Sequence, residues 1–203
     1  MANINEVNYE EIPGKANEMQ QEGVQLNAEL SAAWNRVNDL RSTWHGLRYN
    51  TLISYFNNIT DEVNELLDLV ICKIPETLGI VAKNYASAEG TSVAAVGAGS
   101  VTMIETLSES DTSTMAYNSG NASDVQSTVS SNFSNAENYM NSIESIFSSI
   151  NWESDASEAF RQKFKSLKSQ IIDALTNINT QFTNLMQAAQ TDIESAESAN
   201  TVN

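Results

Sequence analysis

The chain is poor in the residues that staple small proteins together covalently or through a metal ion. Its 203 residues include one cysteine, Cys72, and one histidine, His45. A single cysteine excludes an internal disulfide framework. One cysteine with one histidine also falls short of the usual ligand sets for zinc. We therefore expect a fold held together by packing, with no metal site and no cofactor.

Positive charge is scarce as well. Ten Lys and Arg residues stand against 26 Asp and Glu residues, which gives a formal net charge of −16. Binding to nucleic acid relies on Lys and Arg contacts with phosphates, and anionic membrane surfaces attract basic segments. The composition therefore argues against both partners. It favours solubility and would suit a basic protein partner.

The sequence has no long hydrophobic run. Residues 1–6 show neither the basic nor the apolar region of a secretory signal peptide. The most apolar stretch, residues 93–107, is too short to span a membrane and is interrupted by Gly and Ser. We expect a chain that does not insert stably in a membrane and that leaves the cell, if it does, without a cleaved leader.

Proline and glycine are infrequent, with two and eight copies, so long helices are possible. Pro13 lies where the first turn of a helix tolerates it. Apolar residues then recur at alternating steps of four and three, which predicts a helix packed along one seam. The members of this first stripe are Ile12, Ala16, Met19, Gly23, Leu26, Leu30, Ala33, Val37 and Leu40. The pattern breaks at residues 41–46.

A second stripe predicts another long helix after this break. Its members are Leu52, Phe56, Ile59, Val63, Leu67, Val70, Ile74, Leu78, Val81 and Tyr85. Pro75 lies inside the stripe and should kink the helix, because it removes a backbone hydrogen bond and crowds the carbonyl of Ile71. Residues 90–121 are then rich in Gly, Ser and Thr and are interpreted as a linker. Within it, residues 93–107 are apolar enough to form a short helix or strand, and we expect them to lie along the helices.

The chain then repeats its own pattern. A third stripe leads to Trp152, and a fourth follows it. The third stripe is Val129, Phe133, Ala136, Met140, Ile143, Phe147 and Ile150; the fourth is Phe160, Phe164, Leu167, Ile171, Leu175, Ile178, Phe182, Met186, Ala189 and Ile193. The shift that places Trp44 on Trp152 superposes the second stripe on the fourth. We predict an all-α chain of two antiparallel helical hairpins, residues 1–89 and 122–203. Because one hairpin buries little surface alone, we expect the two to pack as an elongated four-helix bundle, a fused pseudo-dimer.

The first interhelical turn carries a recognisable motif, Trp44-His45-Gly46. Glycine at such a turn permits a positive φ and a close backbone approach, and a neighbouring Trp can cap the apolar seam. With its two flanking helices, this half resembles the Trp-Xaa-Gly (WXG, ESAT-six-like) proteins exported by type VII secretion systems. The second half keeps Trp152 but has Ser154 in place of the glycine. The alternative is that Trp44 and Gly46 simply make a good turn.

A second motif, Tyr85-Ala-Ser-Ala-Glu89, ends the second predicted helix. It resembles the Tyr-x-x-x-Asp/Glu export signal of type VII substrates. Residues at i and i+4 lie on one helical face, so one partner groove can read both side chains. The plain reading is a tyrosine at the edge of the core followed by a solvated glutamate. The matching C-terminal segment, Ile193–Glu197, lacks the tyrosine.

Other residues that often carry chemistry have structural interpretations here. We expect His45 to be a solvated turn residue and Cys72 to be a small buried side chain. Residues 97–100 lack the third glycine, the lysine and the strand–turn–helix context of a phosphate loop. Acid–base catalysis would need carboxylates in an enclosed pocket, and the sequence shows no sign of one. We therefore do not expect an enzyme.

The resemblance implies a function in protein binding. It identifies the chain as a leaderless substrate or helper of a type VII secretion system, secreted from the bacterial cytoplasm without a cleaved signal peptide. One implied partner is the secretion ATPase, which would recognise Tyr85, Glu89 and the turn at Trp44 or Trp152. The other is a second protein of WXG or LXG type. The alternative is a cytoplasmic adaptor that pairs with the helical targeting domain of a secreted toxin. A membrane-lytic helical protein fits the acidic charge poorly. Either a monomeric pseudo-dimer or a homo-oligomer is compatible with the sequence.

Overall fold

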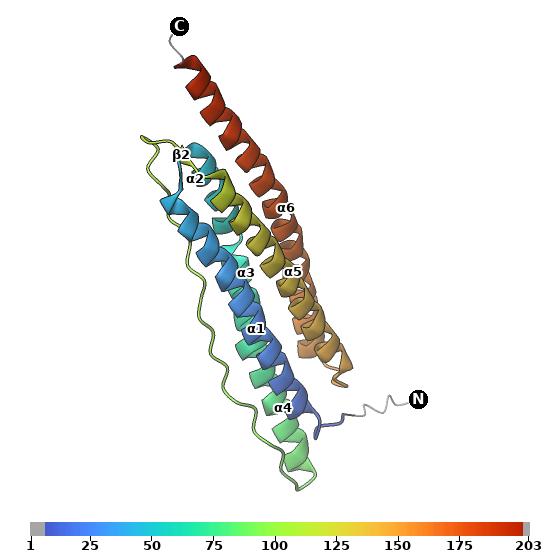
Figure 1. Cartoon of the computed structure of the whole chain (residues 1–203). Helices are drawn as coiled ribbons and strands as arrows, with labels where there is room; N and C mark the ends of the chain where they lie inside the picture. The colour runs from blue at the N-terminus through green and yellow to red at the C-terminus, as the bar shows by residue number, and fades with distance from the viewer. Residues whose placement is uncertain (1–6, 201–203) are drawn as a thin grey trace. The chain divides into compact units, whose positions relative to one another are not determined.

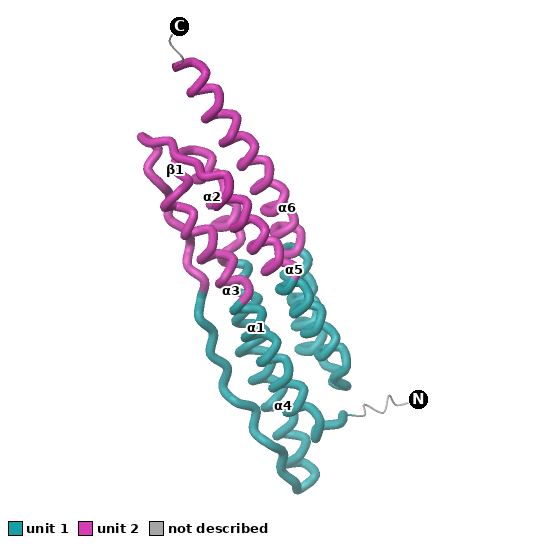
Figure 2. The backbone as a smooth tube through the Cα atoms, viewed as in Figure 1, with its two compact units in different colours: residues 1–28, 62–103, 135–170 teal, residues 29–61, 104–134, 171–203 magenta. Residues whose placement is uncertain are grey.

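The computed structural model describes residues 7–200, and its regular structure is almost entirely helical (Figure 1). This confirms the predicted all-α class. The helices are α1 (Ile12–Asp39), α2 (Leu47–Asn57), α3 (Thr60–Asp68), α4 (Ile74–Ala88), α5 (Ser119–Ser149) and α6 (Asp155–Ala199). The chain divides into two compact units (Figure 2). Unit 1 comprises residues up to 28, 62–103 and 135–170; unit 2 comprises residues 29–61, 104–134 and from 171 onward.

The first apolar stripe is the buried face of α1. Pro13 lies in its first turn, where the missing N–H costs nothing. Every member of the stripe is buried, including Gly23. Leu40 already belongs to a short 3₁₀ turn, η1 (Leu40–Ser42), so the helix ends where the pattern breaks. The predicted seam of the first helix is confirmed.

Pro75 shapes unit 1 in an unexpected way. The helix does not simply kink: a π-helical turn, η2 (Leu69–Lys73), precedes the proline, and α4 starts at Ile74 with Pro75 in its first turn. The N–H of Ile74 donates to the carbonyl of Leu69, five residues back. The wider turn absorbs one extra residue just before the position that cannot donate a hydrogen bond.

The π turn needs space and hydrogen-bond donors from its surroundings in unit 1. A Cβ on Gly23 would lie 2.7 Å from Cγ1 of Ile71, so the glycine of α1 makes room for the bulge. Pro75 cannot donate to the carbonyl of Ile71, and the Gln20 amide donates to that carbonyl at 3.1 Å. Gly99 passes so close that a Cβ there would lie 1.9 Å from the same oxygen. The glycine in the first stripe, Gly23, therefore leaves the space that the side chain of Ile71 occupies.

The core of unit 2 is aromatic and joins helices from both predicted hairpins. Trp34 of α1 packs edge-on against Phe56 of α2, with ring centroids 4.8 Å apart, and against Phe133 of α5 at 6.4 Å. Its indole N–H donates to the buried hydroxyl of Thr60 at 3.2 Å. Such aromatic pairs stabilise beyond their buried area by about 0.5–1.5 kcal/mol each. The three helices thus share one core in this unit.

The third and fourth stripes are the inward faces of α5 and α6. All members of the third stripe are buried, and Phe160, Met186 and Ile193 of the fourth are half-buried. Helix α5 begins at Ser119, within the predicted linker, because the side chain of Asn118 accepts a hydrogen bond from the N–H of Asn121 at 3.0 Å and caps the helix. The stripes are therefore confirmed, with the helix three residues longer than expected.

The connector, residues 91–115, forms neither the helix nor the strand that residues 93–107 were expected to form. It is extended, and every third residue faces inward: Val93, Val96 and Gly99, then Val101, Ile104, Leu107 and Ser110. A period of three is that of a polyproline II helix, which has no internal hydrogen bonds. Helix side chains hold the connector instead; in unit 1, Gln20 and Asn27 donate to the carbonyls of Gly97 and Thr102.

The connector ends in unit 2 with a short antiparallel pair of strands, β1 (Trp44–His45) and β2 (Ala116–Tyr117). Trp44 pairs with Tyr117, and His45 pairs with Ala116. The N–H of Asn118 also donates to the carbonyl of Thr43 at 3.1 Å. This ladder fixes the start of α5 against the interhelical turn at Trp44. Among the described residues 7–200, no helix is both long and apolar enough to cross a membrane.

Candidate functional site

The first candidate site is the turn at Trp44. The indole is 1 % exposed and packs among rings from three other segments of unit 2. Its centroid lies 5.1 Å from Tyr117 of β2, 6.4 Å from Tyr49 of α2 and 6.1 Å from Phe182 of α6. Trp44 is therefore a buried clamp that joins the turn to β2 and α6. It offers almost no surface to a partner.

Gly46 has the backbone that the motif predicted. Its φ is 103° and its ψ is −168°, a region that residues with a Cβ rarely adopt. It caps the N-terminus of α2, and its N–H donates to the hydroxyl of Ser110 at 3.0 Å. An ideal Cβ would lie 3.5 Å from the carbonyl oxygen of Thr114, an ordinary contact. Backbone conformation, not crowding, requires glycine here.

The surface around this turn is a cleft of about 440 Å³ between the turn, the end of the connector and α6. Leu47 and Met115 border it and are 70 % and 59 % exposed. His45 is only half-buried, and its Nδ1 lies 3.2 Å from the hydroxyl of Thr114. The solvated turn residue expected from the sequence is thus tied to the connector.

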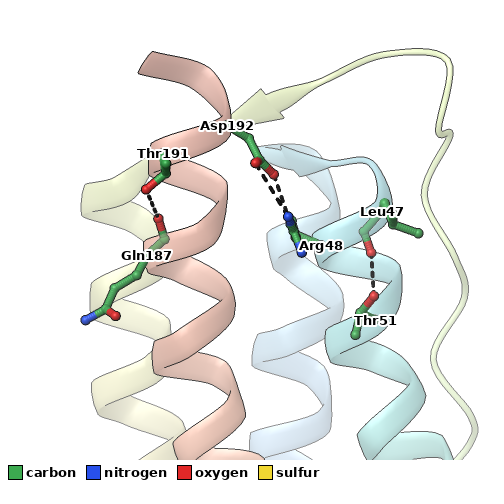
Figure 3. A network of polar contacts seen from close by, with 6 residues as sticks. All are labelled: Leu47, Arg48, Thr51, Gln187, Thr191 and Asp192. Atoms are coloured by element: carbon green, nitrogen blue, oxygen red, sulfur yellow. Dashed lines mark hydrogen bonds and ion pairs between the residues drawn. The ribbon is translucent and has the colours of Figure 1, made fainter. Parts of the chain in front are cut away.

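Two residues that line this cleft, Arg48 and Asp192, form an ion pair (Figure 3). Nε of Arg48, at the start of α2, lies 2.9 Å from Oδ2 of Asp192 on α6. The hydrogen bond and the opposite charge raise the pKa of Arg48 and hold the pKa of Asp192 below its usual range. Both side chains are partly exposed, so water screens the pair and it adds little stability. It links the start of α2 to α6 within unit 2.

The second turn, at Trp152 in unit 1, is built differently. Trp152 is 5 % exposed, and the residue in the glycine position, Ser154, caps α6 by accepting a hydrogen bond from the N–H of Ser157 at 3.1 Å. Among the described residues, positive φ angles occur only at Gly46 and Gly90. Arg161 donates to the carbonyl of Ile150 at 3.1 Å and lies 4.5 Å above the ring of Phe147. At the second turn, a serine that caps α6 therefore stands where the first turn has a glycine with a positive φ.

The second candidate site is the pair Tyr85 and Glu89 in unit 1. Tyr85 is 42 % exposed and Glu89 is exposed, although Tyr85 and Val81 were expected to be buried members of the second stripe. Tyr85 lies seven residues after Leu78, which is fully buried. In unit 1, α4 continues past the start of α1 (Figure 1), but its last turns keep a buried face: Ala82 and Ala86 are 0 % and 1 % exposed. After Leu78 the buried residues follow at steps of four, which leaves Tyr85 outside this face.

The end of α4 holds this pair rigidly. The N–H of Glu89 donates to the carbonyl of Tyr85 at 3.1 Å, which keeps the two residues in helical register. Gly90 has a φ of 70°, and its N–H donates to the carbonyl of Ser87 while that of Thr91 donates to Ala86. These bonds form a Schellman motif, which satisfies the last carbonyls of the helix. The tyrosine and the glutamate are thus presented on an ordered helix end.

A separate cleft of about 630 Å³ runs between α4 and residues 91–99. Cys72 borders this cleft and is half-buried, so the expectation of a buried thiol was wrong. Burial and the nearby carboxylates of Asp68 and Glu76 raise the pKa of this thiol, although Lys73 opposes them. The thiolate is therefore disfavoured, and a reactive cysteine is not indicated.

The first turn belongs to unit 2, with Trp44 and Gly46, whereas the second turn at Trp152 and the pair Tyr85 and Glu89 belong to unit 1. No sequence pattern indicated the Arg48–Asp192 pair, because its members are 144 residues apart. The role of Asn50 and Asn57, which hold the connector, was also missed. Comparison of the chain with models of protein families, with curated proteins and with solved structures gave no match.

Proposed function

We propose that this chain is a protein-binding substrate or helper of a type VII secretion system. The observation that carries the proposal is the exposed pair Tyr85 and Glu89, which share one face of an ordered helix end. The ring of Tyr85 is 42 % exposed, so a partner can reach it. The Trp44–Gly46 turn supports the proposal independently, because Gly46 has the backbone for which the motif needs glycine.

The proposed architecture is a four-helix bundle in which one chain replaces a dimer of hairpins. Contacts inside each unit support this arrangement. In unit 2, Trp44 and Trp34 of the first hairpin contact Phe182 and Phe133 of the second. In unit 1, Nζ of Lys163 on α6 lies 2.6 Å from a carboxylate oxygen of Glu65 on α3. Each hairpin supplies apolar surface that the other one lacks.

The proposed partner is the ATPase of the secretion system. It would bind Tyr85 through the ring and Glu89 through a basic or hydrogen-bonding group, since the two side chains are one helical turn apart. The buried Trp44 would contribute indirectly, because it lines the same cleft as the exposed Leu47. The adjoining cleft supplies an apolar border for a second contact.

The experiment is secretion from cells with an active system and from cells that lack the ATPase. We expect the wild-type chain in the medium only when the ATPase is present. Tyr85→Ala and Glu89→Ala should each reduce secretion at least about tenfold, since loss of one side chain from a small recognition pair costs about 1.4 kcal/mol or more. Ile80→Ala, on the same helix and 54 % exposed, is the matched control and should be secreted normally.

Retention of the wild-type chain in cells with an active system would contradict the proposal. If the retained chain copurifies with the helical domain of a larger secreted toxin, the adaptor function replaces it. A measured solution mass separates the two further. A free monomer supports the fused pseudo-dimer, and a stable hetero-complex supports the adaptor.

A further inference from the structure

Residues 104–110 of the connector are bound to α2 in the manner of a peptide ligand. The side-chain amide of Asn57 donates to the carbonyl of Leu107 at 2.9 Å and accepts from its N–H at 2.7 Å. Asn50 makes the same pair of bonds with the backbone of Ser110, at 3.1 and 2.8 Å. Each asparagine thus replaces the neighbouring strand that an extended backbone would find in a sheet. All these residues lie in unit 2.

The spacing of the two asparagines matches that of an extended chain. Seven helical residues advance about 10.5 Å along the axis. Three residues of an extended or polyproline II segment advance about 9–10 Å. Asn57 and Asn50 therefore meet Leu107 and Ser110 in turn, with the segment antiparallel to α2. Since these bonds go to backbone atoms, they would hold any extended segment in the same register.

Selectivity must then come from the inward side chains. Ile104 and Leu107 are 7 % and 9 % exposed, and they alternate with exposed residues at a period of three. Ser110 is the third inward residue of this segment. Its hydroxyl donates to Oδ1 of Asn50 at 3.0 Å and accepts from the N–H of Gly46 at 3.0 Å. The surface that binds residues 104–110 therefore accepts apolar residues at two positions and a small hydroxyl residue at the third.

We propose that α2 carries a docking groove for an extended segment of another protein, and that residues 104–110 are its resident internal ligand. The matching segment has apolar residues at positions i and i+3 and serine or threonine at i+6. The argument for this occupant is that a segment of this chemistry already fills the groove and is held through its backbone. The groove and its asparagines are distinct from Tyr85 and Glu89, so this proposal stands or fails separately from export.

The internal ligand should compete with an added peptide, because a tethered segment has an effective concentration in the millimolar range. The probe is a fluorescent synthetic peptide with the sequence of residues 103–112, and binding to the full chain is measured by fluorescence anisotropy. The substitutions Ile104→Ser and Leu107→Ser in the protein weaken the resident segment. We expect this double variant to bind the peptide at least about tenfold more tightly than the wild-type chain does.

Two matched controls test the specificity of the groove. In the double-variant background, Asn57→Ala should weaken peptide binding on the order of ten- to thirtyfold, as the loss of two hydrogen bonds implies. The neighbouring Asn58 is exposed, and Asn58→Ala should leave the affinity unchanged. A peptide that carries serine in place of its own isoleucine and leucine should not bind. Circular dichroism spectra confirm that every variant is helical.

Three results would overturn the proposal. The folded double variant binds no peptide, it binds both peptides equally, or Asn57→Ala has no more effect than Asn58→Ala. The wild-type solution mass provides a fourth test. A dimer that dissociates when the peptide is added would show that the groove takes the connector of a second copy of this chain, and not a segment of another protein.

Discussion

The substitution Gly46→Ala tests whether the interhelical turn depends on glycine for its backbone conformation. Gly46 adopts a φ of 103° and a ψ of −168°. Holding a residue with a Cβ in such a region costs on the order of 1–3 kcal/mol. The added Cβ would lie 3.5 Å from the carbonyl oxygen of Thr114, so steric overlap contributes nothing further. The N–H of residue 46 still donates to Ser110, which leaves backbone strain as the whole cost.

The assay is urea unfolding followed by circular dichroism. With a slope of about 2 kcal/mol per molar urea, a loss of 1–3 kcal/mol lowers the midpoint by about 0.5–1.5 M. Gly14→Ala is the control, because its Cβ would meet nothing within 4 Å and its site lies in the first turns of α1. Alanine favours a helix over glycine, so this control should stabilise the chain by up to about 1 kcal/mol. The reasoning is refuted if both variants have the same midpoint at an unchanged slope.

Three further substitutions probe other parts of the chain. Gly99→Ala should accelerate protease cleavage of residues 91–103, because its Cβ would lie 1.9 Å from the carbonyl oxygen of Ile71, whereas Gly97→Ala, with open space around it, should not. Burial raises the pKa of Tyr49 to about 12 from its ordinary value of 10. The unfolded chain therefore loses this proton at a lower pH than the folded chain does. The free energy of unfolding should be unaffected by this group below pH 10 and should fall by about 2–3 kcal/mol by pH 12. The urea midpoint of Tyr49→Phe should fall less over this range. Ser154→Ala removes the cap of α6 and should cost about 0.5–2 kcal/mol in urea unfolding, and an unchanged midpoint would show that the cap contributes nothing.

The helical stripes could be predicted because burial along a helix repeats with a local period. Each member of the first stripe is buried as expected, from Ile12 to Leu40. The same periodicity placed Val81 and Tyr85 on the buried face of α4, and this was wrong: Ala82 and Ala86 are buried in their place. The predicted stripe takes a step of three from Leu78 to Val81, whereas the residues buried after Leu78 follow at steps of four. Trp34 was missed for a related reason: it adjoins Ala33 of the stripe, and only the partners Phe56 and Phe133 reveal it as a core residue.

The connector was predicted least well, because its hydrogen bonds come from residues far away in the chain. Gln20 bonds to Gly97, and Asn57 bonds to Leu107, 77 and 50 residues apart. No local sequence pattern predicts that the side chain of an asparagine will bind the backbone of a distant segment. The apolar residues did carry a signal, since Ile104 and Leu107 are three apart. A period of three fits neither a helix nor a strand. Because a helix or a strand was expected here, this period was overlooked.

The period of the connector sets a rule for its length. Inserting or deleting three residues after Val101 keeps the residues that follow in phase, much as a triplet insertion preserves a reading frame. A change of one or two residues would turn Ile104 and Leu107 toward water and expose two apolar side chains that are now less than 10 % accessible. The chain itself makes a single such change of phase, the step of two between Gly99 and Val101, directly after the closest approach of the connector to Ile71. Variation in this segment should therefore occur in steps of three, in contrast to an ordinary surface loop.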